Sequence, residues 1–199
     1  MTVSDTEEEV GMRRRPRAQS PDRFLLERVA RCDTTDLADA MNGSHVLDAG
    51  IRPLYPDMPA FAGPAVTVFV PAGSQEARKV AMDMAQAGDV LVVAARGISA
   101  FAVLGGKLAA RLKKQGLAGV VIDGYVRDLG EIRDLGLPVF CRGQTPAASP
   151  KTGPGEVNVA VACGETVISP GDIVVGDSNG VVVLPRGAAE AIVAKVQPA

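Results

Sequence analysis

Hydrophobic and polar positions follow two different patterns along the chain. In the first, β-branched apolar runs at residues 65–70, 89–94 and 118–123 alternate with segments of helical spacing at 75–85 and 103–115. Strands that are apolar throughout are typical of a parallel sheet buried on both faces. This part of the chain therefore predicts an α/β layer in which helices cover a parallel sheet.

Beyond Pro138 the apolar segments become shorter and are separated by turns that contain glycine. Glycine supplies the positive φ that such tight turns require. The pattern predicts a small β meander, closed by a helix over residues 187–196. The expected strands cover residues 157–162, 166–168, 173–176 and 181–184.

Two short helices are expected before the first long strand. Ser20-Pro21 resembles an N-cap and a first helical position, and apolar residues follow at helical spacing up to Val29. A second helix is expected to begin at residues 34–35 and to end at Asn42-Gly43, since glycine often terminates helices. Prolines recur between residues 50 and 64 and predict a surface loop there.

The composition fits one domain with a polar tail. The chain has 199 residues, of which 47% are hydrophobic and 22% charged, enough for one sizeable core. Residues 1–19 carry four acids and four arginines with little apolar content, so we expect a disordered tail before a domain over residues 20–199. The arginines alone would suggest a nucleic-acid patch, but the formal net charge of −2 disfavours nucleic acid as a ligand.

Cysteine usage and hydropathy indicate a soluble cytoplasmic protein. Cys32, Cys141 and Cys163 are an odd number of widely spaced cysteines, which fits a reducing compartment and buried structural thiols better than a reactive thiol. No apolar stretch approaches the roughly 20 residues that span a bilayer, so no membrane contact is expected.

The candidate chemistry lies at the two ends of one predicted helix-strand unit. Gly105-Gly106 stands near the start of the helix, and Arg127 and Asp128 follow the strand. A helix of about 10 residues rises about 1.5 Å per residue and a strand of about 5 residues about 3.3 Å, so the chain returns to the same sheet edge. We therefore expect one pocket to contain both ends.

Each of these residues also has a purely structural interpretation. Asp128 and Glu131 have the spacing of a capping box, and Arg127 could pair with Glu131 on a helix surface. Gly105-Gly106 could simply permit close packing at a helix start. Asp123 could be a turn-forming aspartate at the end of its strand.

Six motifs are spread over most of the expected domain: Thr34–Ala40, Ile51–Leu54, Leu104–Leu108, Gly119–Leu129, Ser169–Asp177 and Gly180–Pro185. Together they resemble the RraA-like family, which includes the 4-hydroxy-4-methyl-2-oxoglutarate aldolases. The resemblance covers residues 30–186, nearly all of the expected domain.

The resemblance implies a swivelling β/β/α fold, a single α/β domain with a mixed central sheet, assembled as a homotrimer or homohexamer with active sites at subunit boundaries. It implies that Arg127 is the catalytic residue that binds and polarises a keto acid, and that Asp128 holds a divalent metal. The backbone N–H groups that the resemblance assigns to the substrate carboxylate are those of Gly105, Gly106, Lys107 and Leu108.

These residue types suit a lyase that forms pyruvate from a 4-hydroxy-2-oxo acid. Cleavage releases an enolate, which a divalent cation stabilises by several kcal/mol as a Lewis acid. One coordinating carboxylate is typical of magnesium, and manganese also fits. A single histidine and no cysteine pair argue against zinc. Decarboxylation of oxaloacetate passes through the same enolate and is a second expected activity.

One residue departs from the pattern of the aldolases that the chain resembles. Those enzymes carry an acid at the position of Gly106, where it serves proton transfer. Here the proton acceptor must be another group, such as Asp123 in the second shell, a carboxylate of a neighbouring subunit or a metal-bound hydroxide, or else the reaction differs. Decarboxylation would suffer less, because it removes no hydroxyl proton.

The alternative function is a non-catalytic RraA-type regulator that binds RNase E or a helicase. Such a protein needs no metal carboxylate after the arginine, whereas this chain has Asp128. That residue favours the enzyme.

Overall fold

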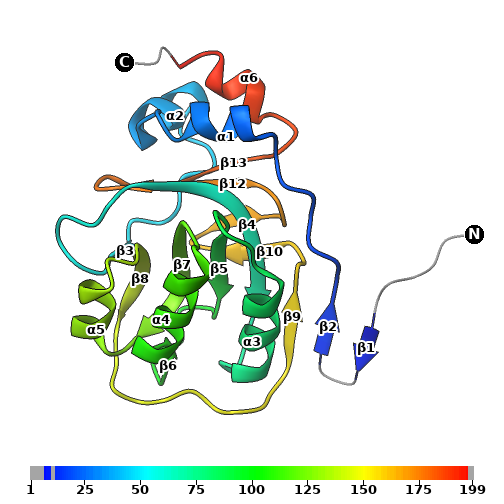
Figure 1. The fold of residues 1–199 in the computed structure, drawn as a ribbon, viewed down its shortest axis with the longest axis vertical. Helices are drawn as coiled ribbons and strands as arrows, with labels where there is room; N and C mark the ends of the chain where they lie inside the picture. The colour runs from blue at the N-terminus through cyan, green and yellow to red at the C-terminus, as the bar shows by residue number, and fades with distance from the viewer. Residues whose placement is uncertain (1–6, 10–11, 197–199) are drawn as a thin grey trace, which may run out of the picture.

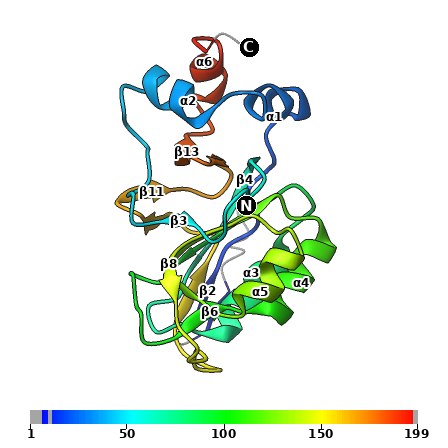
Figure 2. The ribbon, with the colours of Figure 1, turned by 90° about the vertical axis from the view of Figure 1, so that its left-hand side faces the viewer.

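The computed structural model describes residues 7–9 and 12–196. Four parallel strands form the centre of its main sheet, in the order β4, β5, β7, β8. Three helices, α3, α4 and α5, connect them and lie together on one side of the sheet (Figure 2). Their bounds are β4 Phe61–Phe69, α3 Gln75–Met84, β5 Val90–Ala94, α4 Gly106–Gln115, β7 Gly119–Val126, α5 Leu129–Asp134 and β8 Val139–Gln144.

Shorter strands extend this sheet at its edges and make it mixed. The strand β9 is antiparallel to β4 and parallel to β2, β3 is antiparallel to β8, and β6 is parallel to β7. β1 pairs with β2 at the far edge. These elements are β1 Glu7–Glu9, β2 Met12–Arg14, β3 Arg52–Pro53, β6 Ala102–Leu104 and β9 Gly155–Val157.

Two hairpins and three further helices complete the fold. The β12–β13 hairpin pairs with the first half of β4, and α1, α2 and α6 gather beyond it at one end of the molecule (Figure 1). The β10–β11 hairpin forms a separate sheet. The bounds are α1 Arg23–Val29, α2 Thr34–Ala40, β10 Val161–Cys163, β11 Thr166–Ile168, β12 Ile173–Asp177, β13 Gly180–Leu184 and α6 Ala189–Val193.

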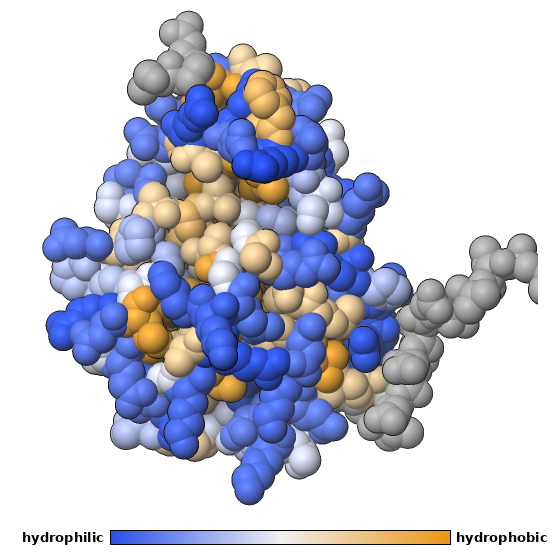
Figure 3. Space-filling view, in the orientation of Figure 1, coloured by the Kyte–Doolittle hydropathy of each residue, from blue (hydrophilic) through white to orange (hydrophobic). Residues whose placement is uncertain are grey.

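Both faces of the central strands are buried, as the continuous apolar runs predict. In β7, Val120 and Ile122 pack in the core under the three helices, while Val121 packs with the β10–β11 hairpin. A third core lies between the β12–β13 hairpin and α1, α2 and α6. The surface over α3 and α4 is mainly hydrophilic (Figure 3). No helix among residues 7–9 and 12–196 has the length and apolar character to cross a bilayer.

The structure corrects several expected element boundaries. The helix expected over 103–115 begins at Gly106, because the buried residues 102–104 instead form β6 beside β7. The loop expected over 50–64 contains β3 and the start of β4. The first helix is capped by Asp22, whose carboxylate accepts the N–H groups of Phe24 and Leu25, and not by Ser20.

The expected β meander is also wrong in detail. The strand expected over 157–162 is split between β9 and β10, which belong to different sheets. Turn chemistry predicted both hairpins correctly, but β12 pairs back to β4, more than 100 residues earlier. Short-range patterns carry no information about such a pairing.

Part of the tail expected over residues 1–19 lies against the domain. Met12–Arg14 form β2, and the Arg17 guanidinium donates to the buried Asp89 carboxylate at 2.5 and 2.9 Å. The boundary expected at residue 20 therefore differs from the structure. Residues 1–6 and 10–11 lie outside the described residues, so the disorder expected there stays a prediction.

Candidate active site

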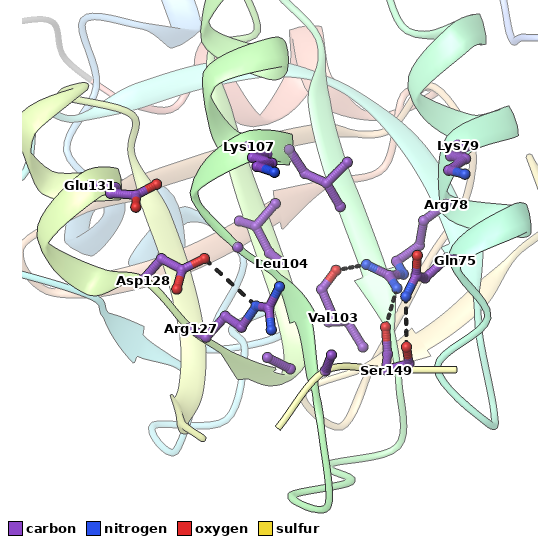
Figure 4. Close-up of a pocket in the computed structure, with 14 residues that line it drawn as sticks. Gln75, Arg78, Lys79, Val103, Leu104, Lys107, Arg127, Asp128, Glu131 and Ser149 are labelled. Atoms are coloured by element: carbon purple, nitrogen blue, oxygen red, sulfur yellow. Dashed lines mark hydrogen bonds and ion pairs between the residues drawn. The ribbon is translucent and has the colours of Figure 1, made fainter. Parts of the chain in front are cut away.

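The start of α4 and the end of β7 meet at one pocket of about 310 Å³ (Figure 4). The expectation that Arg127, Asp128 and the glycine turn lie together is thus met in the geometry. Further walls come from α3, β6, α5 and the segment 148–149. The lining residues are Gln75, Arg78, Lys79, Ala102, Val103, Leu104, Gly105, Lys107, Leu108, Arg127, Asp128, Glu131, Ala148 and Ser149.

Gly105 and Gly106 make room for the charged side chains that approach the start of α4. A Cβ atom on Gly105 would lie 2.7 Å from Asp128 Oδ2 and 3.0 Å from Arg127 Nε. A Cβ atom on Gly106 would overlap the Glu131 carboxylate, with Glu131 Cδ only 2.7 Å away. The glycine pair does permit close packing, and what packs there are the charged groups of the pocket.

Asp128 occupies the left-handed region, with φ 62° and ψ 43°, which aspartate tolerates better than most residues. It precedes α5 but makes no side-chain cap bond to that helix. Its Oδ2 instead accepts the Gly106 N–H at 3.0 Å, at the N-terminus of α4. The capping-box interpretation is therefore wrong in its partner, because this carboxylate stabilises α4.

Arg127 is oriented toward the same cavity (Figure 4). Its Nε lies 3.6 Å from Asp128 Oδ2, and the two side chains are 42% and 39% exposed. No ion pair joins Arg127 to Glu131 among the described residues. A partly exposed guanidinium held by a single long contact keeps donors free for an anionic ligand.

Only some of the backbone amides expected to bind substrate remain free of protein acceptors. The Gly106 N–H donates to Asp128, and the Leu108 N–H donates to the Gly105 carbonyl at 3.1 Å. Within the described part of the chain, the Lys107 N–H has no backbone or side-chain acceptor. The Gly105 N–H has no acceptor there either, and substrate binding by the four residues stays a prediction.

Arg78, a buried cation in the opposite wall of the pocket (Figure 4), was not predicted from the sequence. Its side chain donates to Ser149 Oγ and to the carbonyl oxygens of Gly73, Ser74 and Val103. Burial lowers the pKa of this guanidinium to about 10, and no carboxylate pairs with it among the described residues. One feature of the sequence could have identified Arg78, because it lies on the buried stripe of α3 among apolar residues.

Asp123 lies away from this pocket, although it was a candidate second-shell residue. Side chains alternate along β7, so Asp123 faces the β10–β11 hairpin together with Val121. Its carboxylate pairs with Arg142 and accepts the Gly164 N–H at 3.3 Å. The hydrogen bond to Asp123 raises the pKa of Arg142. The ion pair joins β7 to β8, and the bond from Gly164 joins β7 to the β10–β11 hairpin.

The donor set of the pocket fits magnesium or manganese held by one carboxylate. Asp128 Oδ2 already accepts a backbone N–H, which leaves Oδ1 for a cation. No group of three or more His, Cys, Asp and Glu side chains arranged for a metal exists within residues 7–9 and 12–196, and the lining contains no imidazole or thiol. A hard cation that keeps several waters needs no such group.

Comparison with known proteins places the chain among relatives that match most of its length. A Halalkalibacterium halodurans protein named "Putative 4-hydroxy-4-methyl-2-oxoglutarate aldolase" is 42% identical over 82% of this chain and 78% of its own. A 4-hydroxy-4-methyl-2-oxoglutarate aldolase of Thermus thermophilus is 34% identical over 77% of this chain and 92% of its own.

Solved structures agree with this placement. Streptomyces coelicolor RraAS2, described as an unusual member of the RNase ES inhibitor RraA protein family, has a TM-score of 0.80 and 32% identity, covering 89% of this chain and 92% of its own. The mixed α/β domain is therefore the fold of the RraA structures. The RraA-like family model, described as Aldolase/RraA, matches residues 34–183, and the chain belongs to that family.

Proposed function

We propose that this chain is a divalent-metal-dependent lyase of the cytoplasm that cleaves a 4-hydroxy-2-oxo acid, such as 4-hydroxy-4-methyl-2-oxoglutarate, to pyruvate. Oxaloacetate decarboxylation is a second proposed activity. The observation that carries the proposal is that Arg127, Asp128 and the start of α4 share one pocket. The curated relatives named for this aldolase support it.

The charges around the pocket favour a small dianion. Four cationic side chains line it, those of Arg78, Lys79, Lys107 and Arg127, against the two carboxylates of Asp128 and Glu131. Opposite charge in a concave site raises the local concentration of an anionic ligand. A dicarboxylic keto acid would balance this excess of positive charge.

Arg127 has the chemistry to orient and polarise the keto acid. A guanidinium donates two parallel N–H groups to a carboxylate or to a carboxylate and its adjacent keto oxygen, which a lysine cannot reproduce. The partial positive charge of the α4 N-terminus adds to the field at the same place, where the Lys107 N–H has no acceptor among the residues that the structure describes. Asp128 would hold the cation, which supplies Lewis-acid stabilisation of the enolate oxygen when bound.

The alternative function is a regulator that binds RNase E or a helicase. The solved relatives named as RNase ES inhibitor and RNA-processing inhibitor favour it. Those names describe other proteins, and a pure protein-binding role gives no purpose to a pocket lined by a metal-competent carboxylate and a guanidinium. We therefore rank the lyase first.

The test is pyruvate release by the purified protein, followed through lactate dehydrogenase, with and without Mg²⁺ or Mn²⁺. We expect metal-dependent turnover of 4-hydroxy-4-methyl-2-oxoglutarate or oxaloacetate. Asp128→Ala should abolish it, while an exposed carboxylate outside the pocket, changed as Asp134→Asn, should leave it intact. An absence of metal-dependent turnover on both compounds would favour the regulator.

A further inference from the structure

Two carboxylates line this pocket, and Glu131 is the one with no proposed part in holding the metal. It extends from the first turn of α5 toward the start of α4 (Figure 4). Its Cδ would lie 2.7 Å and its Cβ 3.0 Å from a Cβ atom built on Gly106. The Glu131 carboxylate therefore occupies the volume that a side chain at position 106 would fill.

Cleavage of a 4-hydroxy-2-oxo acid requires a group that accepts the hydroxyl proton. The ionisable side chains of the pocket are two arginines, two lysines, Asp128 and Glu131. Arginine and lysine side chains act as hydrogen-bond donors only, so these four groups offer no lone pair for a proton. Asp128 is engaged by the Gly106 N–H and Arg127 and is the proposed metal ligand, and Asp123 faces the other side of the sheet.

We propose that Glu131 is the catalytic residue that transfers the proton during cleavage, an inference that rests on the proposed function. Its carboxylate accepts the proton of the substrate 4-hydroxyl. The O–H electron pair becomes the second bond of the new C4 carbonyl and the C3–C4 bond breaks. Its electrons form the C2–C3 double bond while the π pair of the C2 carbonyl moves onto its oxygen, which gives pyruvate enolate. Glu131 then returns the proton to C3 as the oxygen electron pair re-forms the C2 carbonyl, and C3 becomes the methyl carbon of pyruvate.

The absence of a side chain at Gly106 makes this arrangement possible. Because residue 106 lacks a side chain, the Glu131 carboxylate can approach the helix N-terminus beside Asp128 and Arg127. The proton acceptor is thus supplied by α5, and α4 supplies the space for it.

The first test compares Glu131→Gln with wild type in two reactions that make the same enolate. We expect aldol cleavage to fall by about 10²–10⁴-fold, the usual contribution of a general base. Oxaloacetate decarboxylation should fall by less than about tenfold, because loss of CO2 needs no acceptor for a hydroxyl proton. Oxalate affinity, measured by calorimetry with Mg²⁺, should change by less than about threefold, because binding does not use the acceptor.

The matched control is Asp134→Asn, which removes a carboxylate from the same helix outside the pocket and should leave both reactions unchanged. Equal losses in cleavage, decarboxylation and oxalate binding would assign Glu131 a structural role and overturn the proposal. Undiminished cleavage in Glu131→Gln would also overturn it, while the lyase proposal would stand. Absence of all wild-type turnover would refute the lyase and this inference together.

The second test moves the carboxylate to the other helix. In Glu131→Ala/Gly106→Asp the two nearest obstacles to the new Cβ, Oε2 and Cδ of Glu131, are removed, and the nearest remaining atom is Cβ of residue 131 at 3.0 Å, which a shift of a few tenths of an ångström relieves. We expect the double variant to recover at least about tenfold of the cleavage lost in Glu131→Ala, because a carboxylate returns to the same volume. A double variant no more active than Glu131→Ala would contradict the proposal.

Discussion

At the scale of single residues, the site depends on a backbone conformation that few side chains adopt. Asp128 has φ 62°, a region that costs a non-glycine residue of order 1–3 kcal/mol. This conformation turns the carboxylate away from its own helix and toward Gly106 on α4. The hydrogen bond at the α4 N-terminus offsets part of that cost. Asp128 thereby stands beside Arg127 in the pocket.

Arg127→Lys is expected to lose most of the lyase activity without loss of folding. The variant keeps the positive charge but loses the planar pair of donors that a keto acid requires. We expect kcat/KM to fall by about 10²-fold or more, with an unchanged thermal transition. Steady-state kinetics beside a melting curve check this, and near-normal turnover would contradict the role assigned to Arg127.

Arg78→Met is expected to destabilise the fold. The change leaves carbonyl oxygens of Gly73, Ser74 and Val103 without their donor, and each buried acceptor left unpaired costs about 1–3 kcal/mol. Urea unfolding should show a midpoint well below that of wild type. The neighbouring exposed residue provides the control, since Lys79→Met should shift the midpoint little. Equal midpoints for the two variants would contradict this account.

The sequence predicted part of the site and missed the rest for a physical reason. Arg127, Asp128 and Gly105-Gly106 flank one helix-strand unit, so chain geometry alone brings them together. Arg78 comes from the preceding helix and Ser149 from a distant segment, and their approach depends on tertiary packing. Glu131 was visible only as a local partner, in a capping box with Asp128 or an ion pair with Arg127, because nothing in the sequence reports the empty volume beside Gly106.

At the scale of elements, a carboxylate at the end of β12 holds the start of α2, one of the three helices that pack on the β12–β13 hairpin. Asp177 accepts the Thr34 N–H at 2.9 Å and the Thr34 hydroxyl at 2.7 Å, at the start of α2. Burial alone would raise the pKa of Asp177, but these bonds and the Asn179 N–H hold it below the usual value of 3.8. The negative charge also suits the N-terminus of α2.

This contact predicts a loss of stability in acid. A carboxyl group whose pKa is lowered by folding stabilises the native state fully above its unfolded pKa, and this contribution disappears as the pH falls through the folded pKa. Asp177→Asn should be less stable than wild type by about 1 kcal/mol at pH 7. The difference should shrink below pH 3.8, the ordinary value for the group. Melting curves from pH 7 to pH 2 test this, and a difference that does not vary with pH would contradict it.

The sequence predicted element types correctly for the long apolar strands and less well for a short apolar segment next to a helix. The runs that became β5 and β7 are apolar throughout, and both strands appeared as expected. Residues 102–104 are equally apolar but directly precede α4, so the sequence pattern predicted a helix that already began at residue 103. These residues pair with β7 instead, and the spacing of apolar residues along the chain does not predict such a tertiary contact.

At the scale of the whole molecule, the pocket of one chain is open on one side. Arg127, Asp128 and Glu131 are all exposed in the single chain, and Leu129, beside them, is one of the few exposed large apolar residues among those described. Water around these groups would weaken every electrostatic interaction that the lyase proposal requires. A neighbouring subunit that covers this side would exclude that water.

The family resemblance implies a homotrimer or homohexamer, and the open pocket leads us to expect that dissociation lowers activity. Light scattering after size exclusion should give three or six times the 20.5 kDa of one chain. On dilution, specific activity should fall over the same concentration range in which the assembly dissociates, because each pocket loses its cover. Full specific activity in a fraction shown to be monomeric would contradict this expectation, since one chain would then suffice to exclude water and complete the pocket.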